Sequence, residues 1–181
     1  KLIARIVEVD TLDIIKKIKD VFNSGFLIPL DIDINNKNEI SSSKTIKIKF
    51  LHDQVQQAVY STIKKDELEK LHYKIGKSLI CHKDIEFNCF EILSHLNFAK
   101  NLVKDKKEKF SLIELNISAS TVAKSSTAYD GALVYLDVAK TILEEFDINE
   151  NHALYIDVLL DYVELLYLTS DFENAKVYEN K

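Results

Sequence analysis

The feature that most restricts the fold of this sequence is a change of hydrophobic period between residues 46 and 63. Ile46, Ile48 and Phe50 alternate with lysines, which is the period-2 pattern of a strand that buries one face. After residue 53 the apolar side chains recur at three- and four-residue spacing, which is the pattern of a helix (Val55, Ala58, Val59, Ile63). The chain is therefore expected to pass from a strand into a helix within a few residues.

Two polar residues, His52 and Asp53, occupy this strand-to-helix joint. Asp53 suits a helix N-cap or first turn, because a short carboxylate accepts hydrogen bonds from unpaired amides and complements the positive end of the helix dipole. The same amides attract a ligand anion, and His52 can add a hydrogen-bond donor to a phosphate oxygen. Residue chemistry alone favours the plainer interpretation, a partly buried histidine beside an ordinary cap, over a phosphate-binding histidine.

Elements around the joint outline a winged-helix module. Strand patterns occur at Phe26–Leu30 and Thr45–Phe50, and the Asn- and Ser-rich residues 35–43 between them predict a long polar wing. A helix is expected to begin at Asp10, and another is expected over Glu67–Ile80. Three Gly and one Pro in 181 residues favour long helices joined by short turns elsewhere in the chain.

From Asp84 to the end, every segment has helical spacing. Two antiparallel helix pairs are expected, the first over 109–125 and 127–146 and the second over 151–169 and 171–181. The second helix of each pair opens with an aromatic residue three positions before an alanine, and the two copies of this pattern lie 43 residues apart (Tyr129 and Ala132, Phe172 and Ala175). Tetratricopeptide repeats pack their helices through similar large and small residues, but with a period of about 34 residues.

These patterns predict a mainly α fold in two parts. The first part, residues 1–83, is a winged-helix module with a small β-hairpin, and the second, residues 84–181, consists of antiparallel, tetratricopeptide-like helical repeats. The charged run Lys104–Lys109 between the predicted helices is interpreted as a solvated turn rather than a phosphate-binding patch, because it also contains acidic residues.

Motifs for catalysis are absent from the sequence. It contains no nucleotide phosphate loop, no dinucleotide-binding glycine motif, no zinc-protease motif and no nucleophile elbow. The histidines are dispersed among different predicted elements (His52, His72, His82, His95, His152). We therefore expect the chain itself to be no enzyme and to hold no cofactor and no metal.

Cysteine usage, charge and hydropathy indicate a cytoplasmic protein. Cys81 and Cys89 have no metal-ligand spacing and are expected to be reduced, core-packed thiols. No apolar run approaches the ~20 residues that span a bilayer, and the first residues lack the layout of a secretion signal. The net charge of −5 disfavours general nucleic-acid binding. Because the chain begins at Lys1 and contains no Met, we expect it to be a piece of a larger protein.

Several segments resemble one family of large signalling proteins. Phe50–Ser61 (FLHDQVQQAVYS) and Leu71–Leu79 (LHYKIGKSL) are similar to segments of AAA-type, STAND-class ATPases that carry a sensor histidine kinase domain, a Ser/Thr protein kinase domain, or both. The resemblance continues through Phe90–Asn97 and Ala123–Tyr129 and covers most of the chain from about Phe26 to Ala175. The first segment is the specific one, because many scaffolds share the helical repeats.

The resemblance implies a position and a role. In such proteins this region follows the nucleotide-binding domain, on which the winged helix packs. The His-Asp pair of their Met-His-Asp motif corresponds to His52 and Asp53, with Leu51 in place of the Met. Carried over, His52 approaches a nucleotide phosphate and Asp53 holds the start of the helix. ATP or ADP and Mg²⁺ then belong to the upstream ATPase domain of the parent protein, which is also the expected partner of this chain.

We therefore expect a non-catalytic regulatory arm that couples the nucleotide state of an upstream ATPase to signalling output through partners bound by the helical repeats. A helical-repeat interaction scaffold without nucleotide coupling is the serious alternative. DNA binding by the winged helix is a weaker one, because lysines of the wing precede a recognition helix rich in glutamine (Lys37, Lys44, Lys47, Lys49; Asp53, Gln54, Gln56, Gln57).

Overall fold

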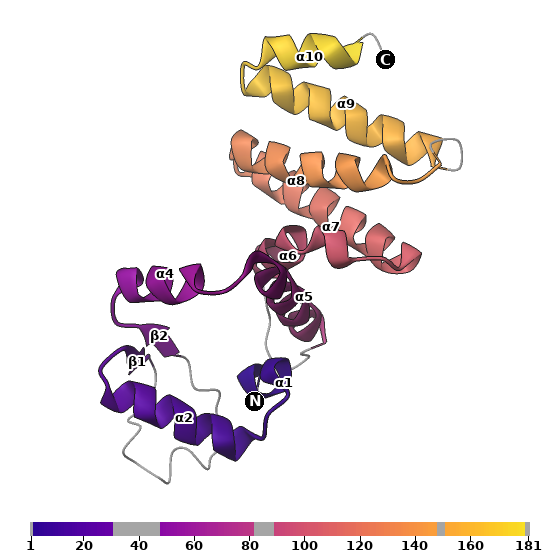
Figure 1. The fold of residues 1–181 in the computed structure, drawn as a ribbon. Coiled ribbons are helices and arrows are strands. Elements are labelled where there is room, and N and C mark those ends of the chain that lie inside the picture. Colours follow the sequence, from indigo (N-terminus) through magenta and orange to yellow (C-terminus); the bar gives the residue numbers. More distant parts are fainter. Residues whose placement is uncertain (1, 31–47, 82–88, 148–150, 180–181) are drawn as a thin grey trace. The chain divides into compact units, whose positions relative to one another are not determined.

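The computed structural model describes residues 2–30, 48–81, 89–147 and 151–179. The chain is mainly helical, with a small two-stranded antiparallel sheet, and it divides into two compact units, Lys1–Ser78 and Leu79–Lys181 (Figure 1). The coarse expectation of a mainly α chain with one small sheet is therefore confirmed. The boundary expected between residues 83 and 84 falls outside the described residues and stays a prediction.

The first unit contains short helices and the sheet. Its elements, in chain order, are α1 (Leu2–Val7), α2 (Thr11–Asn23), β1 (Leu27–Pro29), β2 (Ile48–Phe50), α4 (Asp53–Ser61) and most of α5 (Lys65–Ile80). The start of α2 is capped as expected, because the Asp10 carboxylate accepts a hydrogen bond from the Leu12 amide at 2.8 Å. Gly25 follows the helix with φ +75°, a conformation that glycine adopts without steric cost.

The sheet pairs β1 with β2 in antiparallel register, with Leu27 opposite Phe50 and Pro29 opposite Ile48. The alternation expected for the second strand is present, because Ile48 and Phe50 are half-buried while Lys49 is exposed. The expected wing, residues 35–43, lies outside the described residues.

Helices of the second unit follow one another in space in chain order. They are α6 (Cys89–Phe98), the 3₁₀ turn η1 (Lys100–Leu102), α7 (Lys106–Ser125), α8 (Tyr129–Leu143), α9 (His152–Leu168) and α10 (Phe172–Glu179). Helix α7 packs on α6 and on α8, α8 packs on α9, and α9 packs on α10 (Figure 1). The helix pairs α7–α8 and α9–α10, called the first and second hairpins below, lie where the sequence predicts helix pairs.

The charged run Lys104–Lys109 is a helix start and not a solvated turn. Asp105 caps α7 by accepting hydrogen bonds from the amides of Lys107 and Glu108 at 2.9 and 3.0 Å. Lys109, in the first turn, forms an ion pair with Glu145 beyond the end of α8. The turn interpretation failed because the capping aspartate lies inside the run, so the helix begins there.

The two hairpins turn in the same way. In the first turn Thr127 has φ +59°, its amide donates to the Lys124 carbonyl at 3.0 Å, and the Ala128 amide donates to the Ala123 carbonyl at 2.9 Å. The second turn repeats this pattern, with Ser170 at φ +62° and the Asp171 amide bonded to the Leu166 carbonyl at 2.8 Å. Both are Schellman motifs, which satisfy the last carbonyls of a helix. Their positive-φ residues lie 43 positions apart.

The core lies in the second unit. Its largest fully buried side chains come from α6, α7, α8 and α9, and include Leu93, Ile113, Leu136, Leu143 and Leu165. Ala132 and Ala175, the small residues of the repeated aromatic-alanine pattern, are both fully buried, as the close packing of helices requires. Asn116 of α7 is also fully buried, and its side-chain amide exchanges hydrogen bonds of 2.7 and 3.0 Å with that of Asn97 on α6.

The cysteines differ from the expectation of core-packed thiols. Cys81 is exposed, and Cys89 is only partly covered. Cys81 directly follows the last residue of α5. In the described part of the chain, no helix combines the length and the apolarity needed to cross a bilayer.

Candidate functional site

The strand-to-helix joint that carries His52 and Asp53 is formed as expected. Phe50 ends β2, His52 has extended dihedral angles (φ −129°, ψ 131°), and Asp53 is the first residue of α4. The His52 carbonyl accepts hydrogen bonds from the amides of Val55 and Gln56 at 3.0 and 3.4 Å, which begins the helix. His52 therefore holds the N-cap position, and Asp53 lies in the first turn.

The imidazole of His52 is exposed and makes no capping hydrogen bond. The plainer interpretation expected a partly buried histidine, and that expectation of burial is wrong. As the N-cap residue, His52 adjoins the start of α4, where free amides and the helix dipole favour an anion. The Asp53 carboxylate in the same turn opposes an anionic ligand.

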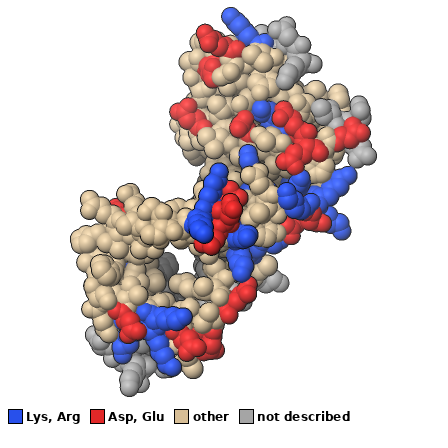
Figure 2. Space-filling model, in the orientation of Figure 1, with Lys and Arg blue, Asp and Glu red and all other residues tan. Residues whose placement is uncertain are grey.

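Helix α4 continues from this joint as an uncovered surface. None of its residues is buried, and apolar side chains of the joint and the helix are among the exposed ones: Leu51 (45% exposed), Val59 (49%) and Tyr60 (42%). Asp53 is its only charged residue, so the surface over α4 is almost without charge in the view of Figure 2. An apolar face of this kind on a surface helix is typical of a contact with another domain or protein.

One polar contact joins the end of α4 to α5. The Tyr60 hydroxyl forms a hydrogen bond with Nε2 of His72, and the two rings meet edge to face with centroids 6.0 Å apart. Burial lowers the pKa of His72 from 6.5, because a desolvated imidazole is less readily charged. Both residues lie in the segments that carry the family resemblance, and neither was predicted to be part of a site.

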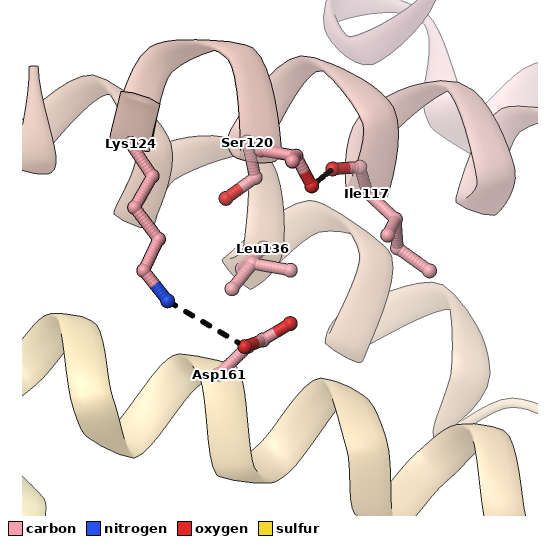
Figure 3. A pocket seen from close by; sticks show the side chains of 6 residues that line it. Ile117, Ser120, Lys124, Leu136 and Asp161 are labelled. Carbon is pink, nitrogen blue, oxygen red and sulfur yellow. Dashed lines mark hydrogen bonds and ion pairs between the residues drawn. The ribbon is translucent and has the colours of Figure 1, made fainter. Parts of the chain in front are cut away.

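The second unit has a small cavity of about 140 Å³ between α7, α8 and α9. Ile117, Ser120 and Lys124 line it from α7 and Asp161 lines it from α9, with Leu136 of α8 at its base (Figure 3). The Lys124 ammonium lies 2.6 Å from the Glu164 carboxylate and 3.7 Å from that of Asp161. The hydrogen bond to Glu164 raises the pKa of Lys124, so the lysine is firmly cationic.

A second lysine is enclosed between the hairpins. Lys140 of α8 is buried, donates to the Tyr178 hydroxyl at 2.9 Å, and lies over the rings of Tyr162 and Tyr178 at 4.9 and 5.1 Å from their centroids. Burial acts to lower its pKa, but the bond to Tyr178 and nearby charges outweigh this, and the pKa lies above its ordinary value. The ammonium is thus a satisfied structural group that ties α8 to α9 and α10.

Sequence reasoning missed both lysine clusters. Lys124 and Glu164 are 40 residues apart and Lys140 and Tyr178 are 38 apart, so no local spacing relates the partners. The available signal was a lysine at a position where the apolar spacing of a helix requires a core residue, as at Lys140. Within the described residues, no group of three or more His, Cys, Asp and Glu side chains converges on a metal site.

Comparisons with known proteins point to signalling. No family model matches the chain, and no solved structure matches it. It is similar to the hybrid signal transduction histidine kinase G of Dictyostelium discoideum, with 29% identity over 151 residues, which covers 68% of this chain. The chain spans about 4% of the length of that relative. The similarity suggests a signalling role, while histidine kinase activity itself is a property of that much longer protein.

Proposed function

We propose that the chain is a non-catalytic regulatory arm of a multidomain signalling ATPase and kinase. In this role it couples the nucleotide state of an upstream ATPase domain to the output of the parent protein. The observation that carries the proposal is the exposed His52 side chain at the N-terminus of α4, next to a helix face without buried residues and almost without charge. The similarity to part of a hybrid histidine kinase supports the signalling context.

The finer architecture belongs to the same proposal. The order α2, β1, β2 and α4 supports a winged-helix module, and the equal turns of the two hairpins support helical repeats that resemble tetratricopeptide repeats. The upstream nucleotide-binding domain covers Leu51 and the apolar side of α4, and it supplies ATP or ADP and Mg²⁺. The repeats bind the signalling partner.

A two-state switch follows from this geometry. A phosphate of the bound nucleotide lies near the first turn of α4, where free amides and the His52 ring donate hydrogen bonds to it. Conversion of ATP to ADP changes this contact, and with it the free energy with which the first unit docks on the ATPase domain. A nucleotide shifts the docking equilibrium only through interactions that differ between the docked and undocked states. The second unit passes this change to its partner.

The test is a substitution of His52 in the full-length parent protein. His52→Ala is expected to reduce the ratio of ADP to ATP affinity by roughly 10- to 150-fold, the effect of losing one charge-assisted hydrogen bond worth roughly 1.5–3 kcal/mol. The readouts are equilibrium binding of both nucleotides and the rate of autophosphorylation. His52→Gln, which retains a neutral donor, should lie between the wild type and His52→Ala.

The matched control is Gln57→Ala, an exposed uncharged residue of the same helix and one turn from the joint. It should leave the nucleotide ratio unchanged. Wild-type nucleotide discrimination and wild-type kinase output in His52→Ala would contradict nucleotide coupling. That result would leave an interaction scaffold whose partner binds equally well in every nucleotide state.

A further inference from the structure

The two hairpins of the second unit can be aligned through their turns. Their Schellman turns place Thr127 and Ser170 at the same point, which aligns α7 with α9 and α8 with α10 at an offset of 43 residues. Residues that close the two turns agree in burial, since Ala123 and Leu166 are both buried. The exposed fraction of each residue in the first hairpin can therefore be compared with that of the residue 43 positions later in the second hairpin.

A stripe on α7 faces the second hairpin. It consists of Ile113, Ile117, Ser120 and Lys124, which follow one another at spacings of four, three and four residues and so share one helix face. Ile117, Ser120 and Lys124 line the cavity that α9 closes with Asp161 (Figure 3). Ile113 is fully buried and Ser120 is 3% exposed. In the first hairpin this stripe is thus a contact surface for the helix pair that follows.

The counterpart on α9, here called the α9 stripe, is mostly exposed. It consists of Ile156, Leu160, Val163 and Tyr167. Ile156 is 39% exposed where Ile113 is fully buried, and Leu160 and Tyr167 are 65% and 44% exposed. The α9 stripe is also more apolar than its counterpart, because valine and tyrosine replace Ser120 and Lys124. Exposed apolar side chains along one helix stripe are typical of a contact surface.

We infer that the α9 stripe is a docking face for a further α-helical hairpin, which packs on α9 and α10 as these helices pack on α7 and α8. The interface between the first and second hairpins is an example of this packing, and a further hairpin repeats it at the same 43-residue offset. The chemistry of the partner follows from the stripe. Lys124 is matched by Asp161 and Glu164 on the next helix, whereas Tyr167 carries no charge, so the partner helix presents apolar or small residues at those positions.

This inference does not depend on nucleotide sensing by His52. It is tested by extending the full chain with a second copy of residues 139–181 after Lys181. In the copy, Asp161→Ala and Glu164→Ala remove the charges that would otherwise face the α9 stripe. The copy begins at Ala139, so its first residues extend α10 and keep the 43-residue offset between hairpins. The copied Lys140 then lies in the extended α10, beside the copied Tyr162 and Tyr178.

Four variant chains complete the design. Leu160→Lys and Val134→Lys are each made in the original chain and in the extended chain. Val134 of α8 is the matched control, because it is 62% exposed but lies outside the α7 stripe and the α9 stripe. Readouts are hydrogen exchange of the α9 amides, the midpoint of thermal unfolding and the helical circular dichroism. The extended chain should gain helical signal and protect the α9 amides by about tenfold or more.

Leu160→Lys should change little in the original chain and should abolish the added protection in the extended one. Val134→Lys should have the same small effect in both. Three results would overturn the inference: an appended copy that does not fold, equal effects of Leu160→Lys in both chains, or a dimer of the original chain that dissociates with Leu160→Lys. The last, measured by light scattering, would assign the α9 stripe to a second copy of this chain.

Discussion

At the scale of single residues, the clearest pH-dependent group is His72 beside Tyr60. Burial lowers the pKa of His72 below 6.5, so well above that pH the imidazole is neutral in both the folded and the unfolded chain. As the pH falls below 6.5 the unfolded chain takes up the proton first, and the folded state loses stability until the pH reaches the lowered pKa. We predict that an NMR titration of the His72 ring gives a midpoint below 6.5.

Two variants of Tyr60 separate burial from hydrogen bonding. Tyr60→Phe keeps an aromatic ring against the imidazole, so the His72 pKa should stay lowered. Tyr60→Ala opens the imidazole to water, so the His72 pKa should return toward 6.5. A wild-type midpoint at or above 6.5, or one that Tyr60→Ala does not move, would contradict the role of burial.

The residue scale also shows where sequence reasoning succeeds and where it stops. His52 and Asp53 were found at the joint because the change of period is local, and period-2 and period-3.6 patterns are set by neighbouring residues. The exposure of His52 could not be read in this way, since it depends on which distant segments pack nearby. The pairing of Lys124 with Glu164 escaped for the same reason.

At the scale of elements, the hairpin turns are formed by residues that are unfavourable there. Thr127 and Ser170 both have positive φ, a conformation that costs an L-residue roughly 1–2 kcal/mol. Thr127→Gly should raise the free energy of unfolding by about 0.5–1 kcal/mol, the remainder after the greater chain entropy of unfolded glycine. Ser126→Gly is the matched control, because Ser126 precedes it in the same turn at φ −93° and should gain nothing. Chemical denaturation measures both, and equal effects of the two variants would rule out the proposed strain.

At the scale of the whole molecule, the helix order and the small sheet followed from apolar spacing and from scarce Gly and Pro. Helix ends were less accurate where a cap lay inside a charged run, as at Asp105. The uneven distribution of the core between the two units could not be predicted, because apolar helix faces look alike in sequence whether or not another element covers them. Leu68 is the one buried apolar side chain of the described part of the first unit.

This uneven core predicts how stability is distributed. Helix α4 has no buried residue, whereas α7 buries Leu112, Ile113, Asn116, Ala119, Ser120 and Ala123. Local opening is easiest where few apolar contacts are lost, so in the isolated chain the α4 amides should exchange at least about 100-fold faster than those in the middle of α7. Amide hydrogen exchange followed by mass spectrometry or NMR measures both helices in one sample. Equal protection of α4 and α7 would show that α4 is covered within the chain itself.

If the upstream domain docks on α4, the same amides should become protected in the full-length protein while those of α7 stay unchanged, because binding stabilises only the elements that it covers.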